Sequence, residues 1–256
     1  MGRRIFITAA EVSGDHHAAG LIEALRSLAP DLQFEGLGGE EMRRAGATIH
    51  FETVSGAAMG LRGAARAAEI WRYLRWTRKY YAADPPILHV CVDSPAMNFA
   101  FAKLARKRGV PVLYYIAPQV WAWREGRIRK LRKWVNHIAC ILPFEEQYFR
   151  AKNVEATFVG HPLFDRVAPP AGRAGRDFGE APMVGILPGS RSGVAKANCP
   201  PLLAAADLIR VRFPGVRFQI PTTGATDALV RGLVAGRPDV EVELGGFDRM
   251  VPRCDL

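Results

Sequence analysis

Short apolar runs alternate along the chain with segments in which apolar residues recur every three to four positions. The runs that predict strands in the first 160 residues cover residues 5–8, 33–37, 48–51, 87–92, 112–116, 137–142 and 157–159. Between them, helical spacing places Leu21, Leu25 and Leu28 on one face, and Ala102 and Ala105 on another. Nearly continuous apolar strands that alternate with helices indicate an α/β fold with a parallel sheet covered on both faces.

This alternation is interrupted once, between residues 164 and 182. That stretch is rich in Pro, Gly and Arg and has little periodicity, as is typical of a linker. The pattern then resumes with predicted strands at 183–187, 216–220 and 240–244 and helices at about 195–213 and 226–235. We therefore expect a Rossmann-like domain over 1–165, a linker over 166–182 and a second Rossmann-like domain over 183–256, incomplete with three strands.

Composition narrows the function classes only in part. The chain has 256 residues, of which 49% are hydrophobic, and a net charge of +10. The excess of Lys and Arg favours an anionic partner: a nucleic acid, a phosphorylated metabolite or a membrane surface. No apolar run reaches the roughly 18 residues that a membrane-spanning helix needs. The four cysteines lie far apart, without zinc-ligand spacing, so we expect free thiols in a reducing cytoplasm and no metal site.

A carboxylate stands where one apolar strand ends. Asp93 follows the run at 87–92 directly, and ligands of parallel sheets bind at the carboxyl ends of strands. Ser13 and Gly14 follow the first strand, where Gly14 would let a ligand approach the backbone. Ordinary interpretations stay open: Asp93 as the polar residue of a turn, and Ser13 or Asp15 as the cap of the next helix.

Two further strand ends carry candidate chemistry. In "ILPGSRSG", the N–H groups of Gly189 and Ser190 at a helix N-terminus would suit a phosphate, and Arg191 would add a bidentate contact. A surface turn with a solvated arginine is the alternative. His161 ends another strand just before the linker, which favours a place near an interdomain cleft, although a lone histidine is more often structural. "GLGGEEM" is no dinucleotide fingerprint, because Glu41 occupies the last glycine position.

Two segments combine basic and aromatic residues, at 62–79 and 114–134. The first has six basic residues against one acid, Glu69, with Trp71, Tyr73 and Trp76 among them. The second carries two tryptophans before a strongly basic helix. Such helices suit an anionic bilayer surface. A solvated face with the aromatics in the core is the alternative, and nucleic-acid binding is disfavoured because no recognised motif accompanies the charge.

The motifs also occur in a recognisable order. They are "AAEVSGDHHAAGLIEAL", "FEGLGGEEMRRAG", "AAMGL", "VDSPAMNF", "YYIAPQVWAWREGRIRKL", "ILPFEEQYF", "FVGHPLFD" and "LPGSR". Together they resemble the lipid-A-disaccharide synthase family, from about residue 5 to 191 and more weakly beyond. The combination of "PQVWAWR", "GHPL" and "LPGSR" is the specific part, since each alone is weak.

The resemblance implies a GT-B-like fold of two Rossmann-like domains across a cleft, and a metal-free glycosyltransferase without cofactor. It implies transfer of 2,3-diacylglucosamine from its UDP donor to the 6-hydroxyl of 2,3-diacylglucosamine 1-phosphate (lipid X), at the inner face of the cytoplasmic membrane; an oligomer is possible. Asp93 matches the proposed general base, and Arg191 would stabilise the leaving UDP. The residues that would shape the acceptor side are Ser13, Gly14, Met59, Asn98, Gln119, Trp121 and His161.

Departures from the family pattern keep two alternatives open. Ala96 and Met97 stand where the family usually has an acid and an aromatic residue, and the family's later S-G-T-x-x-x-E segment would lie beyond Leu256. The alternatives are a catalytically silent lipid-binding relative and another GT-B enzyme that uses a UDP-sugar and a different lipid acceptor.

Overall fold

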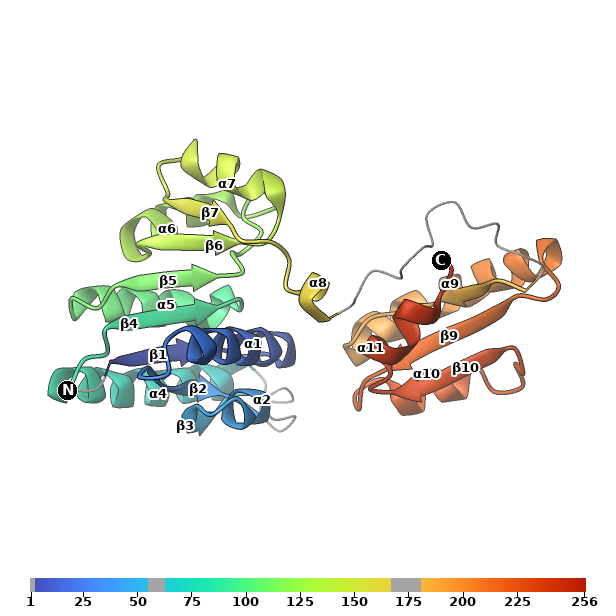
Figure 1. Ribbon diagram of the computed structural model, residues 1–256, viewed down its shortest axis with the longest axis horizontal. Helices are drawn as coiled ribbons and strands as arrows, with labels where there is room; N and C mark the ends of the chain where they lie inside the picture. The colour runs from blue at the N-terminus through green and yellow to red at the C-terminus, as the bar shows by residue number, and fades with distance from the viewer. Residues whose placement is uncertain (1–2, 55–62, 167–180) are drawn as a thin grey trace. The chain divides into compact units, whose positions relative to one another are not determined.

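The computed structural model describes residues 3–54, 63–166 and 181–256. The chain divides into two compact units, Met1–Pro162 and Leu163–Leu256 (Figure 1). The division falls three residues before the domain end predicted at 165. The predicted linker over 166–182 lies almost wholly outside the described residues and stays a prediction.

The first unit contains a seven-stranded sheet in which every pairing is parallel (Figure 1). Its order is β3-β2-β1-β4-β5-β6-β7. The strands are β1 (Arg4–Thr8), β2 (Gln33–Gly38), β3 (Thr48–Glu52), β4 (Leu88–Val92), β5 (Val112–Tyr115), β6 (His137–Cys140) and β7 (Ala156–Phe158). Each coincides with a predicted run to within two residues, so the predicted parallel sheet is confirmed.

Helices cover both faces of this sheet, because alternate strand residues point into two different cores. Phe6 belongs to the core beneath α4 and α5, whereas Ile5 and Ile7 belong to the core beneath α1. The helices of this unit are α1 (Val12–Leu28), α2 (Glu40–Arg44), α4 (Gly63–Ala83), α5 (Pro95–Lys107), the 3-10 turn η1 (Glu125–Arg127), α6 (Ile128–Trp134) and α7 (Pro143–Arg150).

The second unit contains a three-stranded parallel sheet of order β10-β9-β8. Its elements are α8 (Leu163–Arg166), β8 (Met183–Gly185), α9 (Ser192–Arg212), β9 (Arg217–Thr222), α10 (Asp227–Leu233), β10 (Val240–Leu244), α11 (Phe247–Met250) and the 3-10 turn η2 (Val251–Arg253). The predicted strands and helices are confirmed. Helix α9 begins three residues earlier than predicted, so Gly189 to Arg191 stand directly before its first turn.

The strand order places a topological switch point between β1 and β4. From β1 the chain builds outward through β2 and β3, then returns to the opposite side of β1 as β4 and continues through β5, β6 and β7. The connections after β1 and β4 therefore leave in opposite directions. In open α/β sheets the crevice outside these carboxyl ends is where ligands bind. In this chain the ends carry Ala9 to Ser13 and Asp93 to Ser94.

Candidate active site

Asp93 and Ser94 form a left-handed turn at the end of β4. Their φ angles are 47° and 42°, although neither residue is glycine. For L-residues this conformation costs roughly 1–2 kcal/mol each, and such strain is concentrated at functional sites. The turn leaves Asp93 half-buried at the carboxyl edge of the sheet, while Ser94 is buried. The predicted catalytic carboxylate therefore lies at the switch point, on backbone that the surrounding structure must hold in place.

Buried donors hold this turn. The side-chain Nδ2 of Asn98 donates to the carbonyl oxygens of Val92 (2.9 Å) and Asp93 (2.7 Å). The hydroxyl of Tyr114 donates to the same Asp93 carbonyl over 2.7 Å. Burial raises the pKa of the Tyr114 phenol well above its ordinary value, so this group stays a neutral donor. The Asn98 amide is thus engaged in positioning the Asp93 turn, and its expected contact with a substrate stays a prediction.

A chain of buried hydrogen bonds extends from Asn98 into the core. The hydroxyl of Thr8 donates to Asn98 Oδ1 (2.6 Å), so its one proton is used. It therefore accepts from His89 Nε2–H (3.0 Å), and His89 Nδ1 accepts from the Tyr81 hydroxyl (2.7 Å). Burial lowers the pKa of His89 to about 3, which keeps the ring neutral. Each group in this chain accepts a hydrogen bond from the group before it and donates one to the group after it, from Tyr81 to the turn that carries Asp93.

The first turn of α1 lies against the end of β4. Ser13 is exposed there and Gly14 is buried. A Cβ on Gly14 would lie 3.5 Å from the Ala9 Cβ and 3.6 Å from the Val92 carbonyl oxygen. The free N–H groups of a helix N-terminus carry partial positive charge, so α1 brings that charge to the edge where Asp93 lies. The Gly14 contacts therefore place the first turn of α1 beside the strand that Asp93 follows, while the roles of Ser13 and Gly14 toward a ligand stay predictions.

Asp15 does not cap its own helix. The cap residue of α1 is Glu11, with no side-chain cap bond. Instead the buried carboxylate of Asp15 accepts from the backbone N–H groups of Gly39 (2.8 Å), Glu41 (3.0 Å) and Met42 (3.3 Å). These are the first N–H groups of α2. The alternative interpretation that Ser13 or Asp15 caps α1 was wrong: Glu11 is the cap residue, Ser13 lies within α1, and Asp15 binds the start of α2.

The connection after β5 forms the neighbouring part of this edge. Gln119 is exposed there. The Trp121 indole Nε1–H donates to the buried carboxylate of Glu145 (3.0 Å), and its ring packs edge-on against Phe144 at 4.9 Å. Glu145 also accepts from the Leu142 backbone N–H at the start of α7. Trp121 is thus bound to α7, the helix that follows β6.

Among the predicted acceptor-side residues that the structure describes, His161 does not join this group. His161 follows β7, which is three strands from β4 in the sheet. At roughly 4.8 Å per strand spacing, that places the strand ends about 14 Å apart. Met59 lies outside the described residues. The described site therefore consists of Ser13, Gly14 and Asp93, with Gln119 and Trp121 one strand away.

The second unit carries the predicted phosphate-binding turn. Gly189 has φ +112°, and a Cβ there would lie 2.7 Å from Val194 Cγ1, so the position requires glycine. Ser190 and Arg191 are exposed directly before α9. The Thr223 hydroxyl donates to the Ser190 carbonyl (2.9 Å), which joins this turn to the end of β9. A tight turn with a basic side chain at the N-terminus of a long helix suits a phosphate.

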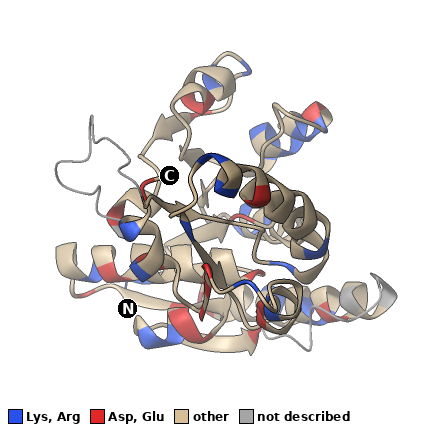
Figure 2. Cartoon of the chain, turned by 90° about the vertical axis from the view of Figure 1, so that its right-hand side faces the viewer, with Lys and Arg blue, Asp and Glu red and all other residues tan. Residues whose placement is uncertain are grey.

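The basic aromatic segments divide between core and surface. Tyr73 is buried and Trp76 stacks on Tyr80, whereas Trp71 and Trp123 are 61% and 76% exposed. Figure 2 shows helices that carry Lys and Arg together with Asp and Glu. Over the described ranges, no helix is long and apolar enough to cross a membrane. The same residues contain no group of three or more His, Cys, Asp or Glu that could hold a metal ion.

Comparison with known sequences and structures places these features in a family context. A sequence model described as lipid-A-disaccharide synthetase matches residues 5–230. The chain is 40% identical over 260 residues to the lipid-A-disaccharide synthase of Geobacter sulfurreducens, covering 98% of this chain and 68% of that protein. It is 37% identical to the synthase of Coxiella burnetii, covering 86% and 60%. The chain thus spans about two thirds of the length of these relatives.

Solved structures agree on the fold. The S. aureus MnaA–UDP co-structure matches with a TM-score of 0.65 at 9% identity, over 94% of this chain and 68% of that one. UDP-GlcNAc 2-epimerase from Neisseria meningitidis, bound to UDP-GlcNAc, matches with a TM-score of 0.65 at 10% identity, over 98% and 75%. At these identities the likeness shows the fold alone. The predicted GT-B-like α/β architecture is confirmed.

Proposed function

Because this chain belongs to the lipid-A-disaccharide synthase family, we propose that it carries the acceptor side and part of the donor side of such a glycosyltransferase. The reaction moves 2,3-diacylglucosamine from its UDP donor to the 6-hydroxyl of 2,3-diacylglucosamine 1-phosphate. The hydroxyl oxygen bonds to the anomeric carbon, the bond from that carbon to UDP breaks, and the configuration inverts. The products are a β-1,6-linked disaccharide phosphate and UDP.

Asp93 is the general base of this proposal. A sugar hydroxyl is a poor nucleophile at neutral pH, so a positioned group must take its proton as the new bond forms. The observation that carries the assignment is the strained turn of Asp93 and Ser94 at the switch point, held by Asn98 and Tyr114. No other carboxylate among the described residues combines a left-handed backbone with that position.

The turn before α9 would receive the leaving group. Charge develops on the diphosphate of UDP as the anomeric bond breaks. N–H groups of Gly189 and Ser190, the partial charge of the helix N-terminus and the Arg191 guanidinium are the groups that would stabilise it. The residues proposed to shape the acceptor side are still those named from the sequence: Ser13, Gly14, Met59, Asn98, Gln119, Trp121 and His161.

The acylated substrates favour work at a membrane surface. Both sugars carry acyl chains that a bilayer holds, so we infer peripheral association with the inner face of the cytoplasmic membrane. The exposed indoles of Trp71 and Trp123 and their basic neighbours support this inference.

The test compares Asp93→Asn with the unchanged protein in a transfer assay that measures UDP release and disaccharide formation. Loss of general-base catalysis is expected to lower kcat by about 10²- to 10⁴-fold while the fold is kept. Asp31→Asn is the matched control, because Asp31 is an exposed carboxylate paired only with the surface residue Arg3 in the described structure. Unchanged turnover in Asp93→Asn would remove Asp93 from this role. Lipid binding without transfer in the complete protein would favour the silent relative instead.

A further inference from the structure

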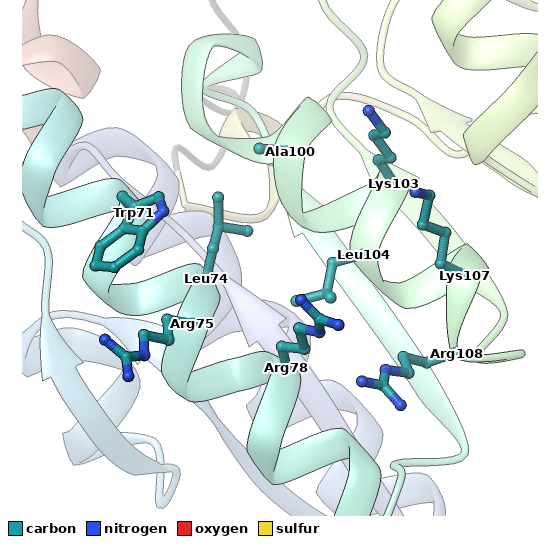
Figure 3. Close-up of a pocket in the computed structure, with 9 residues that line it drawn as sticks. All are labelled: Trp71, Leu74, Arg75, Arg78, Ala100, Lys103, Leu104, Lys107 and Arg108. Atoms are coloured by element: carbon teal, nitrogen blue, oxygen red, sulfur yellow. The ribbon is translucent and has the colours of Figure 1, made fainter.

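A groove between α4 and α5 lies outside the site described above. It has a volume of about 810 Å³, is open to solvent, and lies on the side of the first unit that α4 and α5 cover (Figure 3). Its lining residues are Trp71, Leu74, Arg75, Arg78, Ala100, Lys103, Leu104, Lys107 and Arg108. Figure 3 shows the residues of α4 on one side and those of α5 on the other, with Arg78 extending toward Leu104.

Both helices present the groove with the same spacing. The α4 residues recur at i, i+3, i+4 and i+7, and the α5 residues continue that pattern to i+8, so each set forms one stripe on its helix. Five of the nine lining residues are cations and none is acidic. In the described part of the chain, none of these five cations makes a salt bridge with a carboxylate; such pairs do neutralise Arg4, Arg43 and Arg210 elsewhere.

Five cations around one groove make the local potential positive, which favours the binding of an anion there. Cations three or four residues apart on one helix, such as Arg75 and Arg78, lie well within the Debye screening length of roughly 10 Å at 0.1 M salt. The groove is not purely ionic, however, because Leu74, Leu104 and Ala100 supply apolar surface between the charges. At one end stands the exposed Trp71 indole, with the Arg75 guanidinium 5.5 Å from its ring centre. Cations around apolar surface beside an exposed indole match the boundary of headgroup and acyl chain.

We propose that this groove binds the phosphate headgroup of an anionic phospholipid in the bilayer. The inference gives a place and a ligand to the membrane association proposed above, and in that respect rests on it. The groove leads away from the sugar site: its lining on α5 begins at Ala100, about 8 Å along the helix from Pro95, and extends to Lys107, about 18 Å from Pro95, with Arg108 beyond it. A lipid bound there would hold the first unit against the membrane without occupying the site of transfer.

The test measures co-sedimentation of the chain with vesicles and needs no sugar substrate, so its outcome is independent of the transfer assay. The vesicles contain phosphatidylglycerol and phosphatidylcholine, or phosphatidylcholine alone, at about 0.1 M salt. Replacing Arg78, Lys107 and Arg108 by Gln together is expected to lower partitioning onto the anionic vesicles about a hundredfold. The matched control replaces three exposed cations of the second unit, Lys196, Arg212 and Arg217, by Gln. It removes the same charge and is expected to change partitioning by only a few-fold.

Two further arms distinguish a lipid site from a site for a soluble phosphate. Brominated phosphatidylglycerol is expected to quench tryptophan emission in the unchanged chain, and Trp71→Phe is expected to reduce that quenching. Glycerol 3-phosphate at millimolar concentration is expected to leave vesicle binding unchanged. Equal losses in the groove and control variants would overturn the proposal, as would displacement by glycerol 3-phosphate, which would indicate a soluble phosphate ligand. Circular dichroism of both triple variants checks that the fold is kept.

Discussion

Asp93 and Ser94 adopt a backbone conformation that both would avoid in a free peptide, and the buried groups around them explain why it persists. The Asn98 amide satisfies two carbonyl groups of the turn, and Tyr114 supplies a third bond to it. Thr8 in turn orients the Asn98 amide. A carboxylate that must meet a hydroxyl within hydrogen-bond distance benefits from such rigid support.

Replacing Asn98 by Ala tests this support at the level of a single side chain. The change removes the buried Nδ2 donor that both the Val92 and the Asp93 carbonyl groups accept from. We therefore expect a loss of about 2–4 kcal/mol in the free energy of unfolding. Urea unfolding measures it. Ala96→Ser is the control, because Ala96 is exposed in the same helical turn and should change stability by at most about 0.5 kcal/mol. Equal stabilities in the two variants would show that the Asn98 bonds contribute little.

His89 makes stability depend on pH. Its pKa is about 3 in the folded protein because it is buried, against an ordinary value of 6.5. Between these values the unfolded chain binds a proton that the folded chain does not, so stability falls as the pH drops below about 6.5. The expected slope is about 1.4 kcal/mol per pH unit.

Denaturation curves at pH 7, 6 and 5 for the unchanged chain and for His89→Gln measure this slope. The stability advantage of histidine over glutamine should shrink toward acid pH. A difference that stays constant over that range would mean that His89 binds its proton equally in both states.

The sequence predicts Asp93 and, through the resemblance, names Asn98 in a different role, but it does not predict the hydrogen bonds that hold the turn. The reason is physical. A polar residue directly after an apolar run can be seen without knowing the fold. The contact of Thr8 with His89 depends on the register of β1 against β4, and that of His89 with Tyr81 on how α4 packs over the sheet. Neither is encoded in local periodicity, and the only local indication is a histidine inside an apolar strand.

At the scale of elements, Asp15 connects α1 to α2. Asp15→Ala removes the acceptor of three N–H groups at the start of α2, so we expect a loss of about 2–3 kcal/mol in stability. Hydrogen exchange at the amides of Gly39, Glu41 and Met42 should accelerate. Glu23→Ala, an exposed acid on the same helix, is the control and should leave these amides protected. Unchanged exchange in Asp15→Ala would contradict the capping role.

The same residue shows where local capping rules fail. An acid in the first turn of a predicted helix is naturally assigned to that helix. Here the carboxylate faces α2, whose five residues are too few to produce a periodic signal. The long helix α9 was predictable from its periodicity. The described strands, some of them only three residues long, were predictable because burial in a sheet gives them short apolar runs.

At the scale of the whole molecule, each apolar core lies within one unit. The two described clusters of the first unit contain 24 and 12 buried residues, and that of the second contains 10. Burial of apolar surface is the main favourable term in folding, so the second unit is expected to be the less stable one. The pattern of the sequence predicted two domains for the same reason, because periodicity stops and restarts around residues 164–182.

Unfolding in urea can separate the two units, because all five tryptophans lie in the first. Tryptophan fluorescence therefore reports that unit alone, whereas far-UV circular dichroism reports both. We expect the dichroism to begin to fall at a lower urea concentration than the fluorescence changes, since multidomain chains need not unfold in one step. A fragment ending at Pro162 should reproduce the fluorescence transition of the whole chain and lack the earlier dichroism change. Coincident transitions in the whole chain, together with a shifted one in the fragment, would show instead that the two units stabilise each other.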